Sequence, residues 1–182
     1  MVIKRLMVSL LLIATCSWAI AVTRYEVSTD AQEVIDASTG LVWRRCAEGM
    51  KASQSGCTGV AATFMYDAAL AHATAQAASG LAWRVPTLNE LCFIADRNHE
   101  NPAIDPVAFP STPSQAFWSS TPHVRYSTYA WFVSFAYGAV LNDFSESAHH
   151  VRLVRNGSVL GSLYPSSTPK TPLRAGDDCP KL

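Results

Sequence analysis

Four cysteines follow the first 21 residues and constrain the fold more than any other feature of the chain: Cys46, Cys57, Cys92 and Cys179. No two of them stand at the Cys-x-x-Cys spacing typical of a structural zinc site, so a metal site is the weaker interpretation. An even cysteine count in an oxidising compartment indicates two disulfides, although four cysteines allow three pairings. We expect Cys46–Cys57, which closes a short loop, and Cys92–Cys179, which ties the C-terminal tail to the domain.

The N-terminal residues predict export. A short basic stretch precedes an apolar run from 6 to 13, and a small-x-small pattern of the kind that signal peptidases recognise ends at Ala21. The run is shorter than the roughly 20 residues that a membrane span needs. We therefore expect residues 1–21 to be a signal peptide, with no membrane span after cleavage and the remainder in the periplasm, on the cell surface or secreted. A retained anchor and lipidation of Cys16 are the alternatives.

Without residues 1–21 the chain is slightly acidic. Lys4 and Arg5 are two of the 14 basic residues, so 12 remain against 14 acidic residues and the net charge is −2. Nucleic-acid-binding domains normally carry a basic surplus or stripe, so we expect no nucleic-acid partner. The length fits one domain of ordinary size over 22–161, followed by a tail rich in Ser, Thr and Pro over 162–182.

The first half of the domain predicts a hairpin and then a helix. Two apolar segments, Val34–Asp36 and Leu41–Trp43, flank a turn in which Gly40 can adopt the left-handed backbone that tight hairpins need. From Phe64 onward the spacing becomes helical, and Gly80 is the expected C-cap. The residues that carry this spacing are Phe64, Ala68, Ala71, Ala75 and Ala78.

The second half predicts a shorter helix, an irregular insertion and further strands. Thr87-x-x-Glu90 is a capping box, in which each side chain satisfies a backbone donor of the other residue. The expected apolar face of the helix that follows is Leu88, Leu91, Cys92 and Ala95. Three X-Pro pairs predict a turn-rich excursion over 97–113. The segments expected to complete an antiparallel sheet are Phe117–Trp118, Ala130–Phe135 and His149–Arg155.

Five short motifs occur in a fixed order along the chain: Asp36-x-x-Thr39-Gly40-Leu41-x-Trp43, Trp83-Arg84-Val85-Pro86-Thr87-x-x-Glu90-Leu91, Asn101-Pro102-Ala103-Ile104-Asp105, Phe117-Trp118-Ser119-Ser120-Thr121 and Val151-Arg152-Leu153-Val154-Arg155. Together they resemble the Lcl C-terminal domain family, named for a collagen-like adhesin, over about Glu33 to Arg155. The family is similar to C-type-lectin-like and sulfatase-modifying-factor folds. The resemblance implies a compact α+β domain of the C-type-lectin-like kind, with two helices on antiparallel strands and a long irregular insertion.

The same resemblance implies a function in attachment or ligand display, because the family's namesake binds sulfated glycosaminoglycans. This chain lacks the collagen-like repeats of that namesake. Fold resemblance alone does not establish function, which depends on the individual residues of the site.

Several conspicuous side chains have both a structural and a functional interpretation. Trp43, Trp83 and Trp118 could form a sugar-stacking surface, but large aromatics within apolar strands favour the core. Arg84 and Glu90 could contact ligand, although an ion pair that fixes the strand-to-helix junction is the favoured alternative.

The sequence offers little support for a metal site, a cofactor site or a catalytic site. His149 and His150 are adjacent, so on a strand they point to opposite faces and do not readily share one ion. Of the two sugar-binding calcium triplets of C-type lectins, one has no match and only Leu141-Asn142-Asp143 echoes the other, which leaves open a structural ion near Asp105, Asn142 or Asp143. Disulfides would consume the cysteines that a sulfatase-modifying enzyme needs, and no Gly-x-Ser-x-Gly elbow is present. We expect no enzyme, no metal and no cofactor.

The loop between two predicted strands, His123 to Tyr129, is the expected binding surface. It is polar, aromatic and basic, and binding residues concentrate on such loops. The predicted contact residues are His123, Arg125, Tyr126 and Tyr129, with Arg152 and Arg155 from the final strand. Tyrosines offer contact area at low entropic cost, and Arg125 can grip a sulfate or carboxylate in a bidentate manner.

The predicted function is an exported, adhesin-like binding module for an anionic glycan or a surface protein. An ordinary solvated loop is the alternative interpretation of the site. A structural or assembly component of the cell envelope or a pilus is the alternative function.

Overall fold

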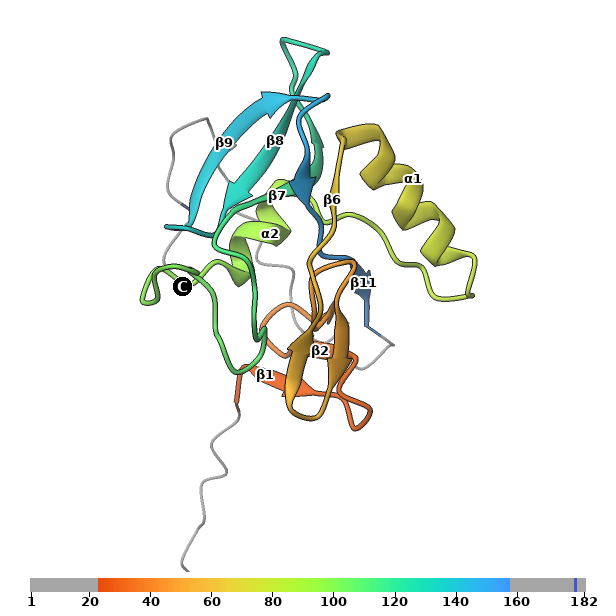
Figure 1. The fold of residues 1–182 in the computed structure, drawn as a ribbon, viewed down its shortest axis with the longest axis vertical. Helices are drawn as coiled ribbons and strands as arrows, with labels where there is room; N and C mark the ends of the chain where they lie inside the picture. The colour runs from red at the N-terminus through yellow and green to blue at the C-terminus, as the bar shows by residue number, and fades with distance from the viewer. Residues whose placement is uncertain (1–22, 158–178, 180–182) are drawn as a thin grey trace, which may run out of the picture.

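The structure is a computed structural model that describes residues 23–157 and residue 179. The predicted signal peptide, and the predicted tail apart from Cys179, lie outside the described residues. One sheet has four antiparallel strands in the order β1-β2-β3-β11 (Figure 1). Its strands are β1 (Tyr25–Val27), β2 (Glu33–Asp36), β3 (Leu41–Arg44) and β11 (Val154–Asn156).

A second sheet has five strands in the order β6-β10-β7-β8-β9. Its strands are β6 (Thr63–Phe64), β7 (Ala116–Pro122), β8 (Tyr129–Ser134), β9 (Ala139–Phe144) and β10 (His149–His150). The pairing of β10 with β7 is parallel, and the other pairings are antiparallel. A separate small hairpin consists of β4 (Lys51–Ser53) and β5 (Gly56–Thr58).

Two helices complete the domain and confirm the predicted α+β class. The seven-residue α2 (Leu88–Ile94) packs on β7 and β8, whereas α1 (Tyr66–Ala77) lies at the outer side of the five-stranded sheet (Figure 1). Between Asp96 and Gln115 the chain forms turns and one isolated bridge but no strand or helix, as the proline-rich sequence predicted.

The predicted hairpin is confirmed. β2 and β3 pair with Val34 opposite Trp43, and both side chains are fully buried. Gly40 has a φ of 70°, the left-handed conformation that the turn requires. The buried Asp36 carboxylate accepts hydrogen bonds from the backbone N–H and hydroxyl of Ser38, which closes the turn over the strand end.

The start of α2 also follows the prediction. The Thr87 hydroxyl accepts from the Glu90 N–H, and the Glu90 carboxylate accepts from the Thr87 N–H, which is a complete capping box. Both guanidinium Nη atoms of Arg84 donate to the same carboxylate at 2.7 Å. Arg84 and Glu90 therefore form the structural ion pair expected at this junction.

The last predicted strand, His149–Arg155, was wrong as a single element. The chain passes from one sheet to the other there, because β10 pairs with β6 and β7 while β11 pairs with β3. Residues 151–153 cross between the two sheets with no exposed surface. Alternation of side chains does not encode which sheet a strand joins, so the sequence could not reveal the division.

The first predicted helix begins two residues late and buries a different face. Phe64 belongs to β6, and the buried helical alanines are Ala69 and Ala73. Ala68, Ala71, Ala75 and Ala78 are exposed instead. Alanines surround this helix on every side, so their spacing could not select the face that packs on Trp118 and its neighbours.

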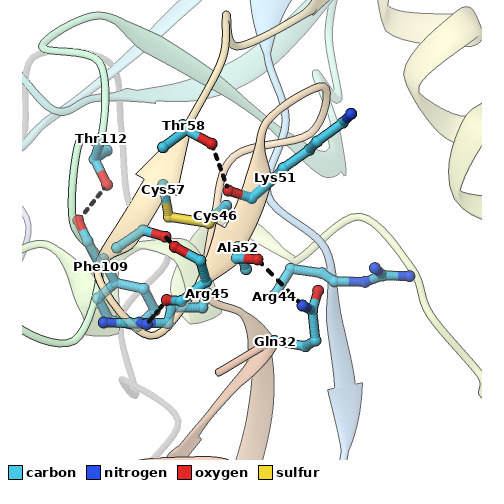
Figure 2. Close-up of a disulfide and its surroundings, with 12 residues drawn as sticks. Gln32, Arg44, Arg45, Cys46, Lys51, Ala52, Cys57, Thr58, Phe109 and Thr112 are labelled. Carbon is cyan, nitrogen blue, oxygen red and sulfur yellow. Dashed lines mark hydrogen bonds between the residues drawn. A yellow bond between two sulfur atoms is a disulfide. The ribbon is translucent and has the colours of Figure 1, made fainter. Parts of the chain in front are cut away.

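Both predicted disulfides are present. Cys46–Cys57 closes an 11-residue separation beside the β4–β5 hairpin, where the Gln32 side chain also donates to the Ala52 carbonyl (Figure 2). Cys92–Cys179 joins α2 to the C-terminal region across 87 residues, and both of its cysteines are buried. The three tryptophans for which a core position was favoured, Trp43, Trp83 and Trp118, are all buried.

Candidate ligand-binding site

One face of β8 is only partly covered by α2. Tyr129, Trp131 and Val133 alternate with buried residues along the strand and share this face. Val133 is fully buried in the core that α2 covers, but Tyr129 and Trp131 lie further along the strand and are partly exposed. A helix of seven residues is only about 10 Å long. The far end of the sheet is therefore left for the β7–β8 loop to cover.

The loop covers this end with a stack of three rings. The His123 ring stacks on Trp131 with centroids 5.0 Å apart and an angle of 22° between the planes. The Tyr126 ring also stacks on His123, at 5.3 Å and 25°. His123 therefore contacts both a strand residue and a loop residue, which holds the loop against the sheet.

A second ring pair extends the stack across the sheet. Tyr129 and Phe144 are directly opposite each other on β8 and β9, and their ring centroids are 4.4 Å apart. Tyr129 also lies 6.0 Å from Tyr126. We call these five residues the aromatic platform: His123, Tyr126, Tyr129, Trp131 and Phe144. Tyr126 is 56% exposed and Phe144 is 54% exposed, so two of the five rings present large surfaces to solvent.

Backbone hydrogen bonds set the shape of the loop. His123 Nδ1 accepts from the N–H groups of Arg125 and Tyr126, at 3.3 Å and 3.1 Å. Because Nδ1 is the acceptor, the proton of the neutral imidazole is on Nε2. The Tyr129 N–H donates to the Tyr126 carbonyl and closes the turn before β8. The platform is thus ordered by contacts within the protein before any ligand binds.

Arg125 extends from the same loop and is exposed. Within residues 23–157 and residue 179, its guanidinium forms no salt bridge. A cation in the same loop as exposed rings suits a ligand that combines a flat apolar surface with a negative group. Four predicted site residues therefore lie in one loop, and the rings of three of them, His123, Tyr126 and Tyr129, contact one another.

Arg152 does not belong to this surface, and its assignment as a ligand contact was wrong. It has no exposed surface, and its guanidinium donates to the carbonyls of Arg44 and Arg45 and to the Thr112 hydroxyl. The charge also lies 4.9 Å from the ring centroid of Phe109. Burial lowers the pKa of Arg152 to about 9, although the nearby Glu48 opposes the shift. Its neighbours show that Arg152 holds the crossing between the sheets together.

Arg155 is also separate from the loop. It lies in β11 of the four-stranded sheet, whereas the loop joins β7 to β8 at the upper end of the other sheet, away from β11 (Figure 1). Its guanidinium donates to Glu33 at 2.5 Å and lies over the Trp83 ring at 5.2 Å. Arg155 therefore has a structural partner on each side and is not brought to the predicted site.

The two adjacent histidines point to different neighbours, as predicted. His149 packs on Trp118 and Phe132 and is hydrogen-bonded to Asp143 at 3.1 Å. Burial lowers the pKa of His149, with Asp143 opposing the shift. His150 instead packs against Phe117. In the part of the chain that the structure describes, no three His, Cys, Asp or Glu side chains gather as metal ligands.

Trp131 and Phe144 belong to the aromatic platform but were not predicted as site residues. A signal for Trp131 was present, because it lies on the predicted strand Ala130–Phe135, two residues after Tyr129, and residues two apart share a face if the strand begins one residue earlier. Phe144 gave no such signal, because β9 was not predicted and its pairing with β8 depends on the tertiary structure.

Comparison with known proteins identifies the domain. A family model described as the Lcl C-terminal domain matches residues 32–155, which include β2 to β10 and the whole aromatic platform. The chain belongs to the Lcl C-terminal domain family. No curated protein and no solved structure matches it. Among the described residues of this Lcl C-terminal domain, no helix has the length and apolar character to cross a membrane.

Proposed function

We propose that this protein is an exported, adhesin-like module that binds an anionic glycan through the aromatic platform and Arg125. The observation that carries the proposal is the pair of ring contacts that His123 makes with Tyr126 and Trp131, with Arg125 in the same loop forming no salt bridge to any described residue. Sugar rings stack on aromatic faces through their apolar C–H surfaces, and a sulfate or carboxylate on the sugar would pair with the guanidinium. Two disulfides support an oxidising compartment, in agreement with export.

The geometry favours recognition by stacking, with charge as a second contribution. The protein's overall charge does not attract anions, so the attraction has to come from the local cation. An exposed ion pair contributes at most about 1 kcal/mol, whereas a ring that stacks on a sugar excludes water over a larger area. We therefore expect Tyr126 to matter at least as much as Arg125.

The test is binding of the oxidised protein to heparin and to uncharged dextran at low and high NaCl concentration. We expect heparin binding that weakens with salt, because exposed charges are screened. Tyr126→Ala should weaken binding about fivefold or more at both salt concentrations, by loss of stacking area. Arg125→Ala should weaken binding mainly at low salt and reduce its salt dependence.

The matched control is Tyr137→Ala. Tyr137 is 55% exposed, almost the same as Tyr126, but it lies in the turn between β8 and β9, outside the platform. Equal losses in the Tyr126 and Tyr137 variants would contradict the assignment of the site. If the wild-type protein binds neither heparin nor dextran, the alternative function takes precedence, in which the exposed rings dock onto an envelope or pilus component.

A further inference from the structure

A pocket of about 490 Å³ lies beside β1, at the opposite end of the molecule from the aromatic platform. It is within the range of about 300–1,000 Å³ typical of small-molecule sites. Residues from three parts of the chain line it, and none of them belongs to the platform: Thr23, Arg24, Tyr25, Val27, Asp96, Asp105, Val107 and Ala108. Four of these eight residues supply apolar surface: Tyr25, Val27, Val107, which is 77% exposed, and Ala108.

Two carboxylates of this lining, Asp96 and Asp105, form no salt bridge with a lysine or arginine within residues 23–157 and residue 179, although His99 Nδ1 lies 2.9 Å from Asp96 Oδ2. Asp105 Oδ1 accepts from the N–H groups of Val107 and Ala108, and Asp96 Oδ1 accepts from the Asn98 N–H. These backbone contacts orient the carboxylates without neutralising their charge. Burial acts to raise the pKa of Asp96, but hydrogen bonds from Asn98 and His99 outweigh it and hold the pKa below the ordinary value. Asp96 is therefore ionised at neutral pH.

Arg24, the cation in the lining, is already hydrogen-bonded to other groups of the protein. Arg24 donates through Nε and Nη2 to the buried Asp36 carboxylate, at 3.2 Å and 3.0 Å, and through Nη2 to the Phe93 carbonyl. The charges of Arg24 and Asp36 therefore cancel, and Asp96 and Asp105 leave the pocket with a negative excess. The same charges act on the phenol of Tyr25. Burial is the largest cause that raises the pKa of Tyr25; Arg24 lowers it, and Asp36, Asp105 and Asp96 raise it further.

We infer that this pocket binds a small organic cation, an amine on a short apolar body. The ammonium would lie between the Asp96 and Asp105 carboxylates, and the body would lie along the Tyr25 ring and the exposed Val27 and Val107 side chains. Charge complementarity selects a cation over an anion or a neutral compound. A pocket of about 490 Å³ has the size typical of a site for a free small molecule.

The experiment measures binding of n-hexylamine to the oxidised protein by chemical-shift perturbation of backbone amides. Hexanol and hexanoate serve as the neutral and the charge-inverted analogues. We expect hexylamine to shift the amides of Val107 and Ala108 with saturation by about 10 mM, as a millimolar Kd requires. Hexanol and hexanoate should bind at least about fivefold more weakly, the factor that one exposed ion pair supplies.

Two variants locate the site without disturbing the fold. Asp96→Asn with Asp105→Asn removes both charges but keeps an Oδ1 that accepts the same backbone N–H groups, so the turns persist and hexylamine binding should be lost. Val107→Lys alters an exposed residue and places a competing ammonium in the pocket, so it should also abolish binding.

Three results would overturn the inference. They are no saturable shift with hexylamine, equal binding of hexylamine and hexanol, or unchanged binding in the double Asn variant with an unaltered melting temperature. None of these results bears on heparin binding, since the pocket and the platform share no residue.

Discussion

Three arginines that looked alike in the sequence have three different environments. Arg152 is fully buried among carbonyls and rings, Arg155 is paired with Glu33 at a sheet edge, and Arg125 extends from an exposed loop. Both Nη atoms of the buried Arg152 guanidinium donate to backbone and hydroxyl oxygens, whereas its Nε has no hydrogen-bond partner among the described residues. At this scale, burial rather than residue type decides whether an arginine stabilises the fold or meets a ligand.

Replacement of Arg152 should therefore cost the most stability. Arg152→Met fills similar volume but removes the donors to two buried backbone carbonyls and to the Thr112 hydroxyl, which keeps only its bond to the Phe109 carbonyl, so we expect a loss of about 3–5 kcal/mol in urea unfolding. Arg155→Met should cost about 1 kcal/mol, and Arg125→Met less than about 0.5 kcal/mol. If the Arg152→Met protein is as stable as the Arg125→Met protein, Arg152 does not stabilise the crossing between the two sheets.

At the scale of the element, α2 depends on the junction before it. Seven residues are too few for a helix to be stable alone, so the capping box and the Arg84–Glu90 pair must help to position it. Burial tends to raise the pKa of Glu90, but hydrogen bonds from Arg84 and Thr87 outweigh it and hold the pKa below its ordinary value. The helix in turn carries Cys92 and covers Val133, so this junction also positions the sheet that bears the platform.

The junction predicts a pH-dependent effect of Glu90→Gln. A carboxyl group whose pKa is lowered on folding stabilises the protein above its unfolded pKa, and this contribution is lost as pH falls through the folded pKa. We expect Glu90→Gln to cost about 1 kcal/mol at pH 7, after allowance for the partial exposure of Arg84, and almost nothing at about pH 2. Urea midpoints at both pH values measure the difference, with the exposed Glu100→Gln as control. Equal losses at both pH values would contradict the charge-based explanation.

At the scale of the whole molecule, two disulfides brace very different lengths of chain. Cys46–Cys57 stabilises a local loop, whereas Cys92–Cys179 attaches the C-terminal region to the core helix. The entropy removed from the unfolded chain grows with the length of the closed loop. The two bridges should thus contribute unequally to the stability of the domain, even though both are buried.

Removal of each disulfide in turn tests which of the two contributes more to stability. In the chain-entropy model, the Cys92→Ala, Cys179→Ala protein should lose about 4.6 kcal/mol and the Cys46→Ala, Cys57→Ala protein about 2.8 kcal/mol. Denaturant unfolding of both double variants beside the wild type gives the comparison. A larger loss from the short bridge would show that local strain or packing, rather than loop entropy, dominates.

Local patterns were sufficient for much of the fold. The β2–β3 hairpin, the capping box with its Arg84–Glu90 pair and both disulfides could be predicted, because each depends on residues close in sequence or on strong chemical preferences. The order of five motifs indicated the family. The loop from His123 to Tyr129 was also visible, since its composition departs from that of the strands on either side.

The tertiary structure alone decided what these patterns could not. The split between β10 and β11, the packing face of α1, the burial of Arg152 and the addition of Trp131 and Phe144 to the platform all depend on which segments meet in space. Side-chain periodicity reports that a residue has a buried side, but it does not name the partner strand. An arginine between two sheets and an arginine on a loop carry the same letter, and only the surrounding carbonyls, rings or solvent determine their function.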